Sequence, residues 1–84
     1  MTKQEILTAA ATHREMEVMQ HQINIDNYRL AIAEIEQNHS DKDHMQQFAG
    51  QLRELLQSSQ HEQDKEKVLL KVIKMQLDTL STAS

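Results

Sequence analysis

Hydrophobic residues recur every three or four positions through residues 3–37 of this chain. That spacing places them on one side of a helix, because an α-helix has 3.6 residues per turn. Two heptad rows form this side, one with Leu7, Arg14, His21, Tyr28 and Ile35, and the other with Gln4, Ala11, Val18, Ile25 and Ile32. The pattern predicts a first long helix with a mostly apolar seam.

A second heptad pattern runs through residues 42–80 and predicts a second long helix. One row comprises Met45, Leu52, Ser59, Glu66, Ile73 and Leu80, and the other comprises Phe48, Leu55, Glu62, Leu69 and Gln76. Ala49 falls outside both rows, so we expect it to lie off the seam.

The two patterns match when the second helix folds back antiparallel on the first, with facing residue numbers that sum to 80. The polar exceptions in the two seams then meet, as Arg14 and Glu66 do. A slipped register would leave either of these charges against an apolar partner, which costs free energy. In the matched register Val18 faces Glu62, and we expect the Glu62 side chain to bend towards solvent.

The sequence therefore predicts one all-α domain over residues 1–84, a long, coiled-coil-like antiparallel helical hairpin. Its parts are a helix over 3–37, a turn over 38–41 and a helix over 42–80. The expected seam comprises Leu7, Arg14, Val18, His21, Ile25, Tyr28, Ile32, Ile35, Met45, Phe48, Leu52, Leu55, Glu66, Leu69 and Ile73.

The segment NHSDKDH, residues 38–44, supplies the turn. We expect Asn38 to adopt the left-handed conformation that ends a helix, and Ser40 to cap the next helix with Asp43 three residues on. A calcium loop starting at Asp41 would need glycine at its sixth place and glutamate at its twelfth, where the chain has glutamine and leucine. Zinc ligands in a frayed turn would lack neighbouring groups to hold them. We expect no metal and no cofactor.

A three-helix architecture is the alternative fold. Residues 58–67 are wholly polar, and Ser59 and Glu62 have the spacing of a capping box, so a third helix could follow a break near residue 59. The hairpin is favoured because this segment contains no helix-breaking residue, and because a break would lose the polar matches along the seam.

A second apolar stripe lies on the first helix, on the side opposite the seam. It comprises Met16, Met19, Ile23 and Leu30, and the second helix carries a smaller group, Val68, Val72 and Met75. A hairpin uses one face of each helix, so these residues would be exposed in a monomer. We expect them to form the interface of a homodimer, a four-helix bundle. Methionine adapts to varied surfaces, so a host protein is the alternative partner.

Composition narrows the chemistry and the partners. The 84 residues carry a net charge of −4, which repels the phosphates of nucleic acid. No apolar run approaches the ~20 residues that span a bilayer. The chain has no cysteine, no Gly-rich phosphate loop and no Ser, His and Asp arrangement on a rigid scaffold. We therefore expect a cytoplasmic protein that is not an enzyme and that binds neither nucleic acid nor membrane.

In size and composition the whole chain resembles the small, proline-free, cysteine-free, Gln-rich helical proteins of unknown function that lambdoid prophages of enterobacteria encode. It is also similar in hairpin plan to type III secretion needle subunits, but only Ser40 and Asp41 match their Pro-Ser-Asp-Pro turn. The prophage resemblance implies a phage or mobile-element origin. We expect a homo-oligomeric helical adapter or accessory protein that acts through protein–protein contacts. The alternative is a small inhibitor that binds a host protein through its stripe of Met16, Met19, Ile23 and Leu30.

Overall fold

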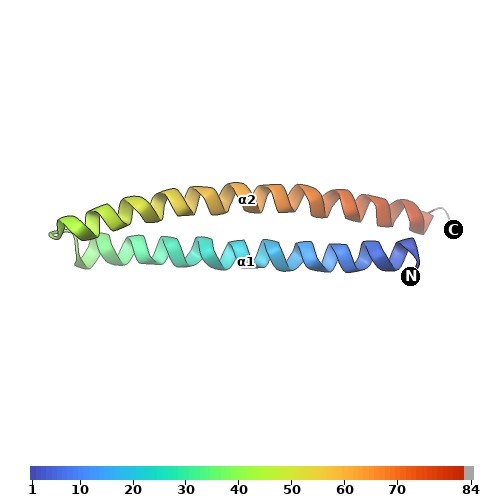
Figure 1. The fold of residues 1–84 in the computed structure, drawn as a ribbon, viewed down its shortest axis with the longest axis horizontal. Coiled ribbons are helices and arrows are strands. Elements are labelled where there is room, and N and C mark those ends of the chain that lie inside the picture. Colours follow the sequence, from blue (N-terminus) through green and yellow to red (C-terminus); the bar gives the residue numbers. More distant parts are fainter. Residues whose placement is uncertain (83–84) are drawn as a thin grey trace.

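Two long helices lie side by side and antiparallel, joined by a short turn (Figure 1). The computed structural model describes residues 1–82, in which α1 spans Lys3–Asn38 and α2 spans Asp43–Thr82. The molecule is a rod of 64 × 16 × 15 Å, and the start of α1 lies beside the end of α2, at the end of the rod opposite the turn. The predicted antiparallel hairpin is therefore confirmed.

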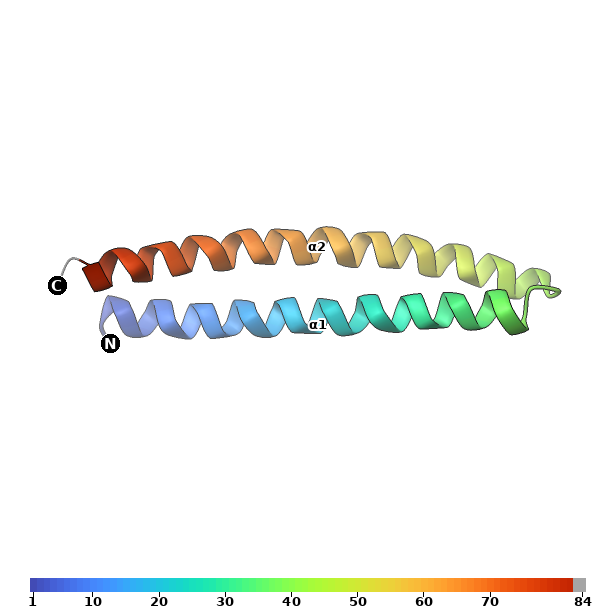
Figure 2. The same cartoon turned by 180° about the vertical axis from the view of Figure 1, so that it is seen from behind.

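The second helix is continuous, so the three-helix alternative is wrong. Figure 2 shows α2 following α1 from the turn to the open end with a gentle bow and no break. The polar segment stays helical because its side chains have partners on α1. Glu66 binds Arg14, and Gln63 hydrogen-bonds to α1 as well.

Thr2 caps the start of α1. The Thr2 hydroxyl oxygen accepts a hydrogen bond from the Glu5 backbone N–H at 3.1 Å, and the same hydroxyl lies 3.2 Å from the Glu5 carboxylate. The first contact stabilises the helix end, because the first turn of a helix has backbone donors without partners inside the helix.

The turn differs in detail from the expected one. It occupies residues 39–42, and His39 ends α1 with φ −136° and ψ 18°. No non-glycine residue among residues 1–82 has a positive φ, so the expected left-handed Asn38 is wrong. Ser40 does not cap α2 either, because the first helical carbonyl of α2 is that of Lys42, which accepts from the Gln46 N–H at 3.1 Å. The chain uses these residues to cross between the two helix axes before α2 begins.

The seam on α1 consists of the two heptad rows identified in the sequence. Within it Ala11, Ile25 and Ile35 are buried. The residues around them are partly buried: Leu7, Arg14, Val18, His21, Tyr28 and Ile32. On α2 the row of Met45, Leu52, Ser59, Glu66, Ile73 and Leu80 is likewise buried or partly buried. The compact part of the core lies near the turn, where Ile35, Ala49 and Leu52 pack together.

The second seam row of α2 was assigned wrongly from the sequence. Phe48, Leu55 and Leu69 are 45%, 48% and 43% exposed. The residues that face α1 come one position later in the chain: Ala49, Leu56, Gln63, Leu70 and Leu77. Ala49 is completely buried, so the expectation that it lies off the seam is also wrong. Ala49 packs against Ile35 and Leu52, so the small methyl group fills this part of the seam.

Candidate protein interaction surfaces

The middle of the seam is polar and fixes how the helices face each other. The Arg14 guanidinium Nη1 donates to both carboxylate oxygens of Glu66, at 3.1 and 3.0 Å. This contact matches the predicted register. The two side chains are 34% and 17% exposed, so the pair is partly shielded from water. A polar contact within an otherwise apolar seam penalises slipped registers, because slippage would leave a charge without its partner.

Gln63 makes the other polar contact across the seam. Its amide Nε2 donates to the Val18 backbone carbonyl at 3.2 Å and to the Gln22 side-chain oxygen at 2.9 Å. Gln63 is 6% exposed and is the buried polar residue of the described chain. It takes the place opposite Val18 that the sequence assigned to Glu62, and it fills that place without burying a charge.

Glu62 turns outward, as expected. Its carboxylate accepts a hydrogen bond from Lys65 Nζ at 3.0 Å on the same helix, and half of its side chain is exposed. This hydrogen bond and the charge of Lys65 lower the pKa of Glu62, so its carboxylate is ionised at neutral pH. Beside it, the seam holds His21, whose Nδ1 is buried and has no hydrogen-bond partner within residues 1–82.

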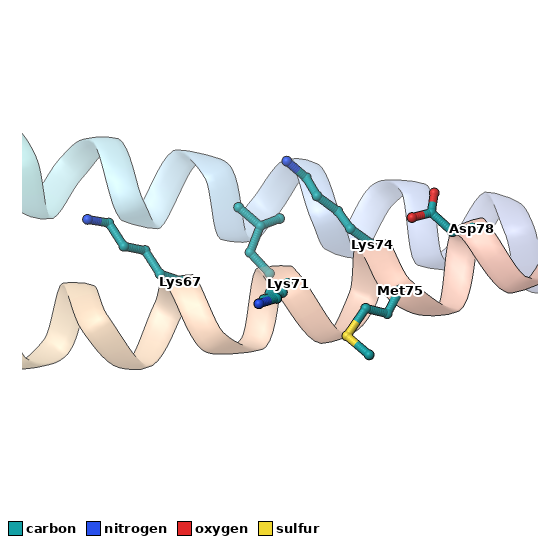
Figure 3. Close-up of a pocket in the computed structure, with 6 residues that line it drawn as sticks. Lys67, Lys71, Lys74, Met75 and Asp78 are labelled. Atoms are coloured by element: carbon teal, nitrogen blue, oxygen red, sulfur yellow. The ribbon is translucent and has the colours of Figure 1, made fainter.

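Possible metal ligands are dispersed over the described residues. No group of three or more His, Asp or Glu side chains within residues 1–82 is placed to hold a metal ion. One open depression is formed by residues of α2: Lys67, Leu70, Lys71, Lys74, Met75 and Asp78. Figure 3 shows these side chains spreading along one helix instead of converging on a point. Lys74 reaches α1 and forms an ion pair with Glu15 at 3.5 Å.

The residues expected to form an interface are all exposed, but the structure does not bring them together. Met16, Met19, Ile23 and Leu30, termed the α1 stripe, are between 51% and 70% exposed. Val68, Val72 and Met75 are 46% to 63% exposed on α2. The α1 stripe lies on the side of α1 away from the seam, and Met75 points away from α1 (Figure 3). Val68 and Met75, which share one heptad row, therefore lie on the edge of the hairpin opposite the α1 stripe, whereas Val72 lies on the broad face beside that edge.

The rod has two broad faces, and they differ in character. Ion pairs cross one of them, Arg53 with Glu36 and Lys74 with Glu15. Glu15 and Glu36 belong to one heptad row of α1, and Arg53 and Lys74 belong to one heptad row of α2. Both rows flank the seam on the same side of the hairpin. The rows on the other side of the seam must share the opposite broad face, which we term the apolar face.

The apolar face carries hydrophobic residues outside the seam, three of which, Phe48, Leu55 and Leu69, the heptad pattern predicts within it. On α2 they are Phe48, Leu55, Leu69 and Val72, and on α1 they are Ile6 and the partly buried Ala10 and Ala31. A sequence signal for this face exists in the adjacent leucine pairs 55–56 and 69–70, because only one member of each pair can enter the seam. The other member must lie beside it.

Comparisons with protein families, curated proteins and solved structures gave no match to this chain. In the described residues, no helix combines the length and the apolar content needed to cross a membrane.

Proposed function

We propose that this chain is a non-enzymatic, homo-oligomeric helical adapter that acts through protein–protein contacts. One observation carries the proposal: more large hydrophobic side chains are exposed than buried. Within residues 1–82, five hydrophobic residues are buried, and two of these are alanines, whereas twelve large hydrophobic residues are exposed. A thin two-helix rod gains most stability by covering such residues with another protein.

The arrangement of the exposed residues supports an adapter, which needs at least two surfaces. The α1 stripe and the apolar face lie on different sides of the rod, so a contact on one leaves the other open. Symmetric association of two hairpins is the commonest way to cover such a surface, and it produces a four-helix bundle. The resemblance to prophage-encoded proteins favours a phage or mobile-element origin and a cytoplasmic site of action.

A second candidate function rests on the α1 stripe. Two of its four residues are methionines, and they are 63% and 64% exposed. Methionine side chains adapt to partners of different shapes. The chain would then be an inhibitor that lays its stripe on a host protein and has no need to associate with itself.

Sedimentation equilibrium at micromolar concentration separates the two functions. The adapter predicts a reversible dimer, whose mass-average molecular weight falls towards that of one chain on dilution. A monomer at every concentration would contradict the homo-oligomeric adapter and would leave the inhibitor as the better account.

A further inference from the structure

We propose that a second copy of this chain packs on the apolar face about a two-fold axis, so that α2 lies antiparallel to the α2 of the partner subunit. The inference rests on the proposed homo-oligomeric function and adds which surface joins the two copies. It departs from the sequence-based expectation, which placed the α1 stripe in the dimer interface. The physical reason is that charges and apolar residues match across the apolar face.

The match is best at the centre of α2. With the axis between Gln63 and Asp64, Glu62 of one copy meets the partner subunit's Lys65, and the symmetric pair repeats the contact. Glu62 already accepts from Lys65 of its own chain at 3.0 Å, so four charges of alternating sign gather around the axis. Such clusters favour the correct partner and oppose alternative registers.

The layers on either side of this cluster also match. Leu55 meets the partner subunit's Val72, and Gln51 meets the partner subunit's Gln76, each twice by symmetry. The layer next to the central cluster pairs Leu69 with the partner subunit's Ser58, and the outermost layer pairs Phe48 with the partner subunit's Thr79. The three hydrophobic residues that the seam excludes are thus covered in one arrangement, and no charge is left against an apolar side chain.

Neighbouring registers lose this match. A shift of one heptad in one direction sets Leu55 against the partner subunit's Lys65. A shift in the other direction sets Glu62 against the partner subunit's Val72. Either shift buries a charged group beside an apolar one without a partner, which is unfavourable. The charge pattern therefore selects a single antiparallel register.

The same axis brings the two α1 helices together on the apolar face. In the heptad register nearest to that axis, Ala31 meets the partner subunit's Ile6, and Lys3 meets the partner subunit's Glu34. The centre of this register lies between Val18 and Met19. Within one hairpin that centre and the centre on α2 are two residues from facing each other directly, an offset of about 3 Å, because each residue advances a helix by 1.5 Å. One two-fold axis therefore serves all four helices.

The α1 stripe fits a second copy less well. When two stripes pair antiparallel, every register that brings them together sets Asp26 against an apolar residue of the second copy. Depending on the register, that residue is Ala9, Met16, Ile23 or Leu30. Asp26 already accepts a hydrogen bond from Gln22 on its own helix, at 3.0 Å, and has no cation opposite it. In the proposed bundle the stripe stays on the outer edge and is available to a different protein.

Charge reversal tests the register without altering the seam. Glu62→Lys alone and Lys65→Glu alone each place like charges around the axis, so each should weaken dimerisation by about tenfold or more in sedimentation equilibrium. Mixing the two single variants in equal amounts should restore dimers, because each chain then meets the opposite charge. This recovery depends only on contacts between chains, since neither variant regains its own Glu62–Lys65 pair.

Leu55→Asp and Ile23→Asp form a matched pair that distinguishes the two surfaces. The proposal expects Leu55→Asp to abolish the dimer and Ile23→Asp to leave it intact, with helicity by circular dichroism retained in both. A dimer that survives Leu55→Asp, or single charge variants that fail to recover on mixing, would overturn the proposed interface. If Ile23→Asp split the dimer and Leu55→Asp did not, the proposed interface would be wrong and the homo-oligomeric function would stand. If the wild-type chain were monomeric, both the interface and the homo-oligomeric function would be wrong.

Discussion

Arg14 on α1 and Glu66 on α2 form a two-pronged ion pair across the middle of the hairpin, with both N–O distances close to 3 Å. The residues are 52 positions apart in the chain. Their pairing at the predicted register ties the two helices together in one alignment. The stability of the hairpin should therefore respond to changes at either residue.

Arg14→Ala should lower the free energy of unfolding by about 1–2 kcal/mol, because it leaves the Glu66 carboxylate partly buried without its cation. The loss of unfolding free energy is modest because a third of the Arg14 side chain is exposed, and water screens its charge. Urea denaturation at fixed protein concentration measures the change. The control is the double variant Arg14→Met with Glu66→Leu, which should be as stable as the wild type or more so. Equal losses for the single and double variants would mean that packing, and not charge, dominates at this layer.

Two isoleucines on α1 offer a matched comparison. Ile25 is 2% exposed in the seam and Ile23 is 51% exposed on the stripe. Ile25→Ala should cost about 2–4 kcal/mol of unfolding free energy, because it leaves a cavity, and Ile23→Ala should change it by less than about 0.5 kcal/mol. Thermal melts followed by circular dichroism report both values. Similar losses at the two positions would show that the stripe is part of the folded core.

The burial of Ala49 is tested by enlarging it. Ala49→Leu should destabilise the hairpin by about 1–3 kcal/mol, because there is no room for extra carbons where the helices approach near the turn. Gln47→Leu introduces the same side chain at an exposed position of the same helical turn and should be close to neutral. Chemical denaturation of the two variants gives the comparison. If both were neutral, Phe48 and not Ala49 would face α1.

Gly50 lies next to the tightly packed Ala49 but has free space around it. A Cβ atom added there would have no neighbour within 4 Å, and the residue has ordinary helical backbone geometry. Gly50→Ala should therefore raise the unfolding free energy by about 0.5–1 kcal/mol through helix propensity. A melting temperature that falls instead would indicate that α2 needs the flexibility of glycine beside the turn.

The antiparallel hairpin and its register could be predicted from sequence because polar residues interrupt both heptads at matching places. Arg14 and Glu66 are spaced so that one register satisfies both. The seam row of α2 could not be predicted in the same way. Leu55 and Leu56 follow each other, so either can complete a heptad with Leu52. The choice between them depends on the rotation of α2 about its own axis, which turns Leu56 towards α1 and leaves Leu55 exposed and has no simple sequence signature.

The interaction surfaces, too, could be predicted from the sequence only in part. Exposure of the α1 stripe follows from its position opposite the seam, and the structure agrees. That Val68 and Met75 of α2 lie on the other edge of the rod depends on how the helices sit in space. Those residues were grouped with the stripe on hydrophobicity alone, and hydrophobicity carries no information about which edge a side chain occupies.

Small-angle X-ray scattering at micromolar concentration tests the two-fold bundle most directly, because it reports mass and shape together. The axis lies near the middle of the rod, so two copies should overlap along nearly their whole length. The account predicts a particle with the mass of two chains and a long dimension close to the 64 Å of one hairpin. A particle with the mass of one chain at every concentration, or a dimer much longer than a single hairpin, would contradict it.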